Sequence, residues 1–97
     1  MRISLADEAL ADFETAIDWY LTERAFVAAT DFADEFERAM TLLGTFPELG
    51  AANESETRAF TLPKFPYSII YRLFPNHIRI IAVANHNRRP AYWAGRR

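Results

Sequence analysis

The chain has 97 residues, enough for one domain with a modest core, and its hydrophobic content of 51% excludes an intrinsically disordered protein. It contains no cysteine, which excludes disulfides, thiolate zinc sites and thiol nucleophiles. No apolar run approaches the ~20 residues that cross a bilayer, and nothing resembles a signal peptide. We therefore expect a cytoplasmic protein without a membrane partner.

Acidic and basic residues are separated along the chain. All thirteen Asp and Glu residues lie between Asp7 and Glu56, whereas the chain from Arg58 onward carries Lys64, seven arginines and both histidines. Formal charges of −10 for the first 57 residues and +8 for the last 40 give the net charge of −2. Such an asymmetry predicts an acidic partner for the C-terminal part.

The N-terminal residues are expected to form a strand and then a helix. Arg2–Leu5 alternates polar and apolar residues, as a short strand does. Ser4, three residues before Asp7, is a weak variant of the capping box that starts a helix. Apolar residues at helical spacing then predict a helix from about Ala6 to Glu23. Its apolar stripe consists of Leu10, Phe13, Ile17, Tyr20 and Leu21.

A second helix is predicted from about Phe26 to Leu43, with Gly44 and Pro47 as stop signals. Its apolar face would consist of Ala29, Phe32, Ala33, Phe36, Met40 and Leu43, and its polar face of Asp31, Asp34, Glu35 and Glu37. Only Arg24 and Ala25 separate the two helices, so we expect an antiparallel helical hairpin.

In the remaining chain the residue pattern has the two-residue period of β-strands. Glu48–Thr57 is expected to be turn and loop. Arg58–Leu62, Tyr67–Phe74 and His77–Ala84 are rich in β-branched and aromatic residues and predict three strands. Pro75-Asn76 suits a tight turn between the last two. The predicted fold class is α+β in the order β-α-α-β-β-β, with an N-terminal helical hairpin packed on one face of a small, mainly antiparallel β-sheet.

The two-residue turn also sets a register, in which Arg72 lies opposite Arg79. The face toward the helices would hold Tyr67, Ile69, Tyr71, Leu73, Ile78, Ile80, Ala82 and Ala84, and the other face Ser68, Ile70, Arg72, Phe74, His77, Arg79, Ile81 and Val83. Two explanations of the paired arginines stay open: they splay into water, or an acidic segment of another molecule lies across them. Counting residues along the strands places Arg58 beside Tyr71 on the face toward the helices. A bulge in the Pro63–Pro66 loop would place Arg58 on the opposite face.

The C-terminal tail from Asn85 to Arg97 contains four arginines and two aromatic residues. This composition is suited to recognition of phosphate or carboxylate groups combined with stacking. We expect Trp93 to pack on the core or the edge of the sheet, and the arginines to make contacts with a partner.

Several motifs occur in this order: Pro47-x-x-Gly50, a strand that opens on Arg58, Phe65-Pro66-Tyr67-x-Ile69-x-Tyr71-Arg72, and Ala82-Val83-Ala84-x-His86-x-Arg88-Arg89-Pro90-x-Tyr92-Trp93. Following two acidic helices, they resemble the ParE branch of the RelE/ParE toxin superfamily, the toxins of bacterial type II toxin–antitoxin modules. The likeness covers nearly the whole chain. It implies a single toxin domain over residues 1–97, of a kind associated with plasmid stabilization.

The resemblance implies growth inhibition by binding of DNA gyrase or a gyrase–DNA complex, without catalysis. It also implies a cognate antitoxin, whose acidic C-terminal segment would neutralise the toxin. The residues expected to contact the target or the antitoxin are Arg72, Arg79, His86, Arg88, Arg89, Tyr92, Trp93, Arg96 and Arg97. Whether the protein forms a homodimer stays open.

RelE-like toxins instead cut mRNA on the ribosome, which needs a base, an acid and cations around the phosphate. Such nucleases carry a basic side chain where this chain has Ser68, and another arginine where it has His86, while Tyr92 matches a tyrosine that they use. This alternative site comprises His86, Arg88 and Tyr92, with Glu54 or Glu56 as the acidic group. A third alternative is a non-toxic orphan that only binds an antitoxin.

No metal or cofactor is predicted. His77 and His86 have no nearby carboxylate in the sequence, which makes a poor metal site. The three glycines form no phosphate-binding loop.

Overall fold

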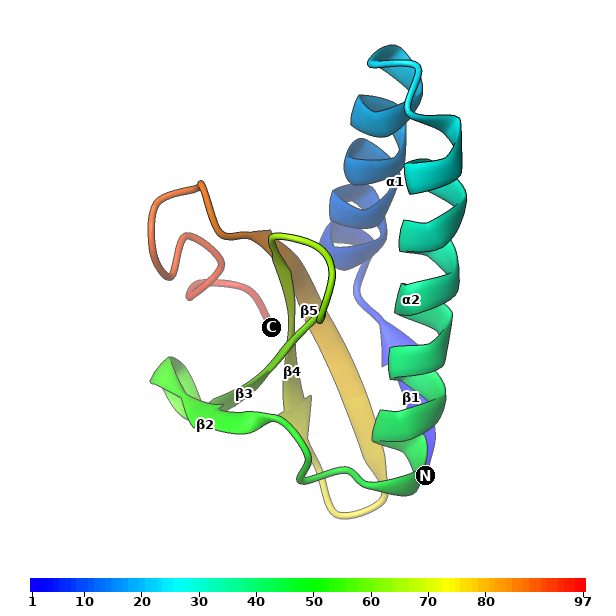
Figure 1. The fold of residues 1–97 in the computed structure, drawn as a ribbon. Coiled ribbons are helices and arrows are strands. Elements are labelled where there is room, and N and C mark those ends of the chain that lie inside the picture. The colour runs from blue at the N-terminus through cyan, green and yellow to red at the C-terminus, as the bar shows by residue number, and fades with distance from the viewer.

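Two helices cover one face of a five-stranded sheet in the computed structural model, which describes residues 1–97 (Figure 1). The elements are β1 (Arg2–Leu5), α1 (Asp7–Thr22), α2 (Phe26–Thr45), β2 (Ala51–Asn53), a 3-10 turn (Glu54–Glu56), β3 (Thr57–Thr61), β4 (Tyr67–Leu73) and β5 (His77–Asn85). The strand order is β1-β5-β4-β3-β2, and only the β1–β5 pair is parallel. The predicted α+β class and helical hairpin are confirmed.

The strand β2 was not predicted, because its segment was expected to be loop. It pairs antiparallel with β3, from Ala51 opposite Ala59 to Asn53 opposite Thr57. Alanine and asparagine have little strand propensity, so the sequence of β2 carries no strand signal of its own. The strand forms because β3 offers it a free edge.

The stripe predicted for α1 is wrong at both ends. Leu10 and Leu21 are 46% and 45% exposed, whereas Ala9 and Ala16 are fully buried. Small alanines let the helix approach the sheet closely, so the larger residues lie to the side. The capping expectation for Ser4 is also wrong: that residue lies within β1, and α1 starts without a side-chain cap.

The predictions for α2 need two corrections. The helix continues through Gly44 and ends at Thr45, and no glycine of the chain has a positive φ. Gly44 therefore acts as an ordinary helical residue rather than as a stop signal. Glu35, predicted to be on the wet face, is only 8% exposed. Its carboxylate accepts a 2.7 Å bond from Arg38, which compensates its charge.

A β-bulge interrupts the hairpin of β4 and β5. From the turn to Tyr71, which lies opposite Ile80, the register is the predicted one. Beyond that point Ile70 pairs with Ala82, so that Ile81 is an extra residue on β5. An extra residue in one strand reverses the faces of every side chain that follows.

The face assignment after the bulge was therefore wrong. Val83 packs in the core under the helices, whereas Ala82 and Ala84 belong to a second cluster on the other face. The register of β3 contains no such shift. Arg58 lies opposite Tyr71, and the two share the helix side, as counting indicated.

The main core is built on aromatic residues around Phe32, which is fully buried. Its ring centroid lies 5.1 to 5.8 Å from those of Phe13, Tyr20, Phe65 and Tyr67. The other face of the sheet carries the small cluster of Ile70, Ile81, Ala82, Ala84 and Trp93. Trp93 comes from the tail and is 4% exposed, which confirms that it packs on the sheet. In Figure 1 the red tail accordingly folds back on the side of the sheet opposite the helices.

The turn from Pro47 to Gly50 is fixed on the hydroxyl group of Tyr71. That hydroxyl donates a 2.7 Å bond to the carbonyl of Pro47 and accepts a 2.9 Å bond from the backbone nitrogen of Gly50. Arg58 adds a 2.7 Å bond from its Nη1 to the carbonyl of Gly50. A Cβ at Gly50 would lie 2.7 Å from the Tyr71 ring, so only glycine allows this approach.

Candidate interaction site

The expected contact residues gather on the sheet face that the helices do not cover. Arg72 and Arg79 lie on neighbouring positions of β4 and β5. The others belong to the tail that folds back over this face, and Trp93 anchors the tail in the second cluster. We call this combination of open sheet face and tail the basic face. Its expected contact residues are Arg72, Arg79, His86, Arg88, Arg89, Tyr92, Trp93, Arg96 and Arg97.

The two opposed arginines do not splay freely into water, because both donate to backbone oxygens. Arg72 donates one bond to the backbone oxygen of Ser55 and another, of 3.3 Å, to that of Arg96. Arg79 donates a 3.1 Å bond from Nε to the backbone oxygen of Arg97. The backbone of the tail thus separates and orients the two guanidinium groups.

Arg96 is the one arginine of the basic face that pairs with an acid. Its Nη1 donates a 2.6 Å bond to Asp12 of α1 and a 3.2 Å bond to the carbonyl of Ile81. The hydrogen bond with Asp12 raises the pKa of Arg96 further above its usual value. Asp12 also accepts a 3.0 Å bond from the backbone nitrogen of Val83. Arg96 therefore holds the tail against α1 and β5.

The remaining arginines of the basic face have no carboxylate partner. The structure contains only two ion pairs, Arg38–Glu35 and Arg96–Asp12. This leaves five positive charges on the basic face without compensation: Arg72, Arg79, Arg88, Arg89 and Arg97. The ten acids of the first 37 residues lie in α1, in α2 and between the two helices. The separation of charge along the sequence is thus also a separation in space.

Tyr92 is the stacking residue of the tail. The guanidinium carbon of Arg88 lies 3.7 Å from its ring centroid, and that of Arg96 lies 5.3 Å away. Such cation–π stacking holds a guanidinium plane in a fixed orientation. Burial raises the pKa of the Tyr92 hydroxyl, and the charge of Asp12 raises it further. The hydroxyl therefore remains protonated at neutral pH.

A cavity of about 300 Å³ opens between the tail and the sheet. It is lined by residues of the alternative nuclease site, namely His86, Arg88, Tyr92 and Glu54, among others. The Nε2 of His86 lies 2.8 Å from the hydroxyl of Ser68, which in turn lies 3.1 Å from that of Thr61. These two hydroxyl groups orient the imidazole at the edge of the cavity.

Sequence reasoning missed three residues of this site. Asp12 contacts a backbone group 71 positions away, and nothing in its helical context distinguishes it from the other acids of α1. Ser55 and Thr61 were loop and strand residues without a motif. Ser68 was noted only because a basic residue was expected there. The contact of Asp12 with Arg96 depends on how the tail folds back, that of Ser55 with Arg72 on the turn before β3, and that of Thr61 with Ser68 on the pairing of β3 with β4.

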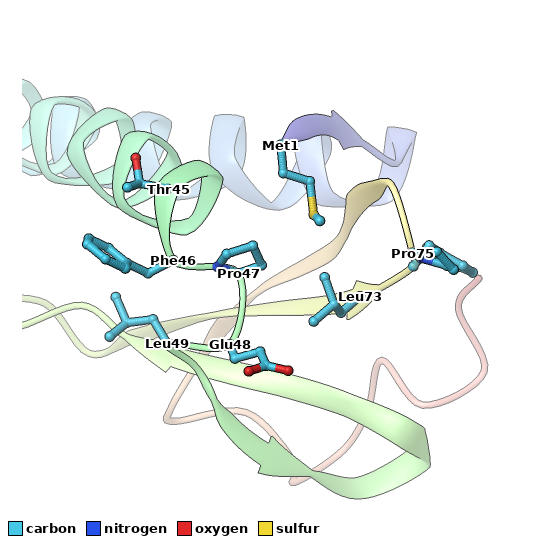
Figure 2. Close-up of a pocket in the computed structure, with 9 residues that line it drawn as sticks. Met1, Thr45, Phe46, Pro47, Glu48, Leu49, Leu73 and Pro75 are labelled. Carbon is cyan, nitrogen blue, oxygen red and sulfur yellow. The ribbon is translucent and has the colours of Figure 1, made fainter.

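The largest cleft of the molecule lies elsewhere. Figure 2 shows it between the end of α2, the loop that follows, and the turn from β4 to β5. Its volume is about 710 Å³, and its lining is mainly apolar: Met1, Thr45, Phe46, Pro47, Glu48, Leu49, Leu73, Phe74 and Pro75. It contains none of the expected contact residues.

No three His, Asp or Glu side chains converge in a way that could hold a metal ion. Among the helices, neither is long and apolar enough to cross a membrane.

Fold and site together define a small α+β protein with an acidic helical layer and a basic face. Residues 3–90 match the family model described as the ParE toxin of the type II toxin–antitoxin system parDE. The chain therefore belongs to the ParE toxin family, which confirms the resemblance of its motifs. It is also similar to a chain of the chromosomal ParDE toxin–antitoxin system from P. aeruginosa, with a TM-score of 0.76 and 22% identity over 88% of this chain and 95% of that chain. At this identity the likeness shows the fold. No curated protein matches the sequence.

Proposed function

We propose that this toxin inhibits growth by binding DNA gyrase, or a gyrase–DNA complex, through its basic face. The observation that carries the proposal is the set of five arginines without a carboxylate partner on one surface. Guanidinium groups bind phosphate and carboxylate in a bidentate way, and such charge-assisted bonds are stronger than neutral ones. A surface of this kind suits an anionic client.

The residues of the basic face divide into two roles in this proposal. Arg88 and Arg89 are exposed and carry charge that is available for the client. Trp93 and Arg96 are engaged inside the chain, so they support the surface rather than contact the client. Arg72 and Arg79 are oriented by bonds that leave their charge uncompensated.

A cognate antitoxin is the second partner in the proposal. Its acidic C-terminal segment would compete for the same arginines, with apolar residues in a groove between helices and sheet and carboxylates on the guanidinium groups. Neutralisation then follows because the client and the antitoxin need the same charges.

The test is supercoiling by purified gyrase in the presence of the protein. We expect inhibition, or a stabilised cleavage complex, at micromolar protein. The double variant Arg88→Ala/Arg89→Ala should lose at least tenfold in potency, and Arg2→Ala, which removes an exposed arginine of the acidic half, should stay within twofold. Absence of inhibition by the unmodified protein at micromolar excess would refute the proposal.

Ribosome-dependent cleavage of mRNA is a second candidate, supported by one observation. The C-terminal part of the chain has no acidic residue of its own, but Glu54 lines the same cavity as His86, Arg88 and Tyr92. An imidazole and a carboxylate at one phosphate site can supply the base and the acid of RNA cleavage. This candidate predicts mRNA cuts that disappear in His86→Ala and in Tyr92→Phe. If toxicity persists in both variants, cleavage is not its cause.

A further inference from the structure

The outer edge of β5 is only partly covered. The parallel partner β1 pairs with its first residues, from His77 to Ile80, and then turns into α1 (Figure 1). The backbone nitrogen of Ala6 makes the last bond, of 2.9 Å, to the carbonyl of Ile80. The five residues of β5 that follow therefore have a neighbouring strand on one side only.

Two backbone groups at this edge are occupied by side chains. Arg96 donates to the carbonyl of Ile81, and Asp12 accepts from the nitrogen of Val83. Since backbone groups alternate along a strand, the carbonyl of Val83 and the nitrogen of Asn85 point the same way, away from β4. The nitrogen of His86, one residue later, donates 2.8 Å to Pro66 on the other side, which agrees with this alternation.

The pattern of free groups selects the direction of a further strand. An antiparallel neighbour would need both backbone groups of Val83, or both of Asn85. The backbone nitrogen of Val83 already donates to Asp12, and the carbonyl of Asn85 already accepts a 3.1 Å bond from the backbone nitrogen of Arg88. A parallel neighbour needs only the two free groups, because one of its residues donates to the carbonyl of Val83 and accepts from the nitrogen of Asn85. Such a strand would run in the same direction as β1.

Space for a chain exists along this edge. Two cavities, of about 120 and 260 Å³, lie between α1 and the end of β5. They share Thr15, Tyr67 and Asn85 in their lining and so adjoin each other. One end is bounded by Trp19, whose exposed fraction of 57% leaves an indole face open to a partner. We call this pair of cavities the edge crevice.

The charge of the edge crevice favours an acidic occupant. Asp12 and Arg88 are the only ionisable Asp, Glu, Lys or Arg side chains that line it. Asp12 is neutralised by Arg96, whereas Arg88 has no carboxylate partner. The net charge presented to an incoming chain is therefore positive.

We propose that the edge crevice receives an extended acidic segment of the antitoxin, which pairs parallel to β5 at Val83 and Asn85 and places a carboxylate on Arg88. The choice of the antitoxin as occupant rests on the proposed function. Addition of a strand to an open sheet edge is a common mode of peptide recognition, in which backbone bonds supply affinity and side chains supply specificity. The large apolar cleft of Figure 2 is lined by no basic side chain, and its one charged side chain is the acidic Glu48.

The test uses a defined probe, a capped six-residue peptide that alternates valine and glutamate, in an NMR titration of the intact protein. We expect shifts at the amides of Val83 and Asn85 and at the indole of Trp19, and slower hydrogen exchange at Asn85. The amide of Ala84 points toward β4, so its exchange should be slow throughout and serves as the internal reference. A peptide that alternates valine and lysine should bind at least tenfold more weakly.

Charge-reversal variants separate local recognition from the general positive field. Arg88→Glu should weaken binding of the acidic peptide at least tenfold. Lys64→Glu makes the same change of charge at an exposed residue outside the edge crevice and should alter binding less than twofold. Equal losses in both variants, shifts confined to Arg72 and Arg79, or no shifts at all would each overturn the inference. Gyrase inhibition is not measured here, so failure of this test leaves the proposed function to its own assay.

Discussion

Asp12 and Arg96 lie 84 positions apart in sequence, yet their side chains are joined by a 2.6 Å bond in which both are largely buried. The pair satisfies two backbone groups on the outer edge of β5, the carbonyl of Ile81 and the nitrogen of Val83. One acid of the helical layer thus fixes the position of the basic tail. The stability of the tail should depend on this contact.

Removal of the Asp12 carboxylate should destabilise the protein. Asp12→Ala leaves Arg96 and the nitrogen of Val83 without their partner, and a broken buried pair costs about 3 kcal/mol. Asp12→Asn keeps an acceptor for Val83 and should cost less. Urea unfolding measures both variants. Glu14→Ala, an exposed acid of the same helix, is the control, and equal losses in Glu14→Ala and Asp12→Ala would contradict the importance of the pair.

Gly50 should not tolerate a side chain. Gly50→Ala places a Cβ 2.7 Å from the Tyr71 ring and should cost about 1–3 kcal/mol of the free energy of unfolding, since the buried ring cannot move away freely. Gly95→Ala is the matched control, because nothing lies within 4 Å of its Cβ. It should stay within about 0.5 kcal/mol of the unmodified protein. Thermal unfolding of the two variants gives the comparison.

Alkaline pH should unfold the protein through its tyrosines. Burial raises the pKa of all four, Tyr20, Tyr67, Tyr71 and Tyr92. Because the folded state holds these protons more tightly than the unfolded state, the resulting stability is complete below about pH 10 and is lost as the pH rises through the folded values. Tyrosinate absorbance should appear at higher pH in the folded protein than in urea. Identical titrations in both states would contradict this prediction.

Trp93 should hold the tail on the sheet. Trp93→Ala removes the largest member of the second cluster and should cost about 3 kcal/mol, whereas Trp93→Phe keeps most of the apolar contact. A loosened tail exposes its backbone, so trypsin should cleave after Arg88 faster in Trp93→Ala than in Trp93→Phe. Equal cleavage rates in the two variants would show that the tail is held by other contacts.

The sequence was sufficient to predict the helices and strands in which apolar residues recur at regular spacing. Both helices, the hairpin of β4 and β5, and the pairing of Arg72 with Arg79 were predicted from spacing alone. Burial of Trp93 also followed from its apolar character. These features depend on local residues, which the sequence displays directly.

The failures concern relationships between distant segments. The bulge at Ile81 has no signature in the uniformly apolar run from Ile80 to Ala84, and it reverses the faces of the residues of β5 that follow it. Leu10 and Leu21 fit a helical stripe as well as Ala9 and Ala16 do, and only the close approach of the sheet decides which are buried. The contacts of Arg72, Arg79 and Arg96 depend on a tail whose path no periodicity describes.

The additional residue Ile81 in β5 decides which side chains face the tail. Ile78, Ile80 and, beyond the bulge, Val83 belong to the core under the helices, whereas Ala82 and Ala84 pack with the indole of Trp93. Shortening the strand by Ile81 would direct the two alanines into the aromatic core and raise Val83 beneath the tail. The tail that carries the arginines would then lose the cluster on which it packs.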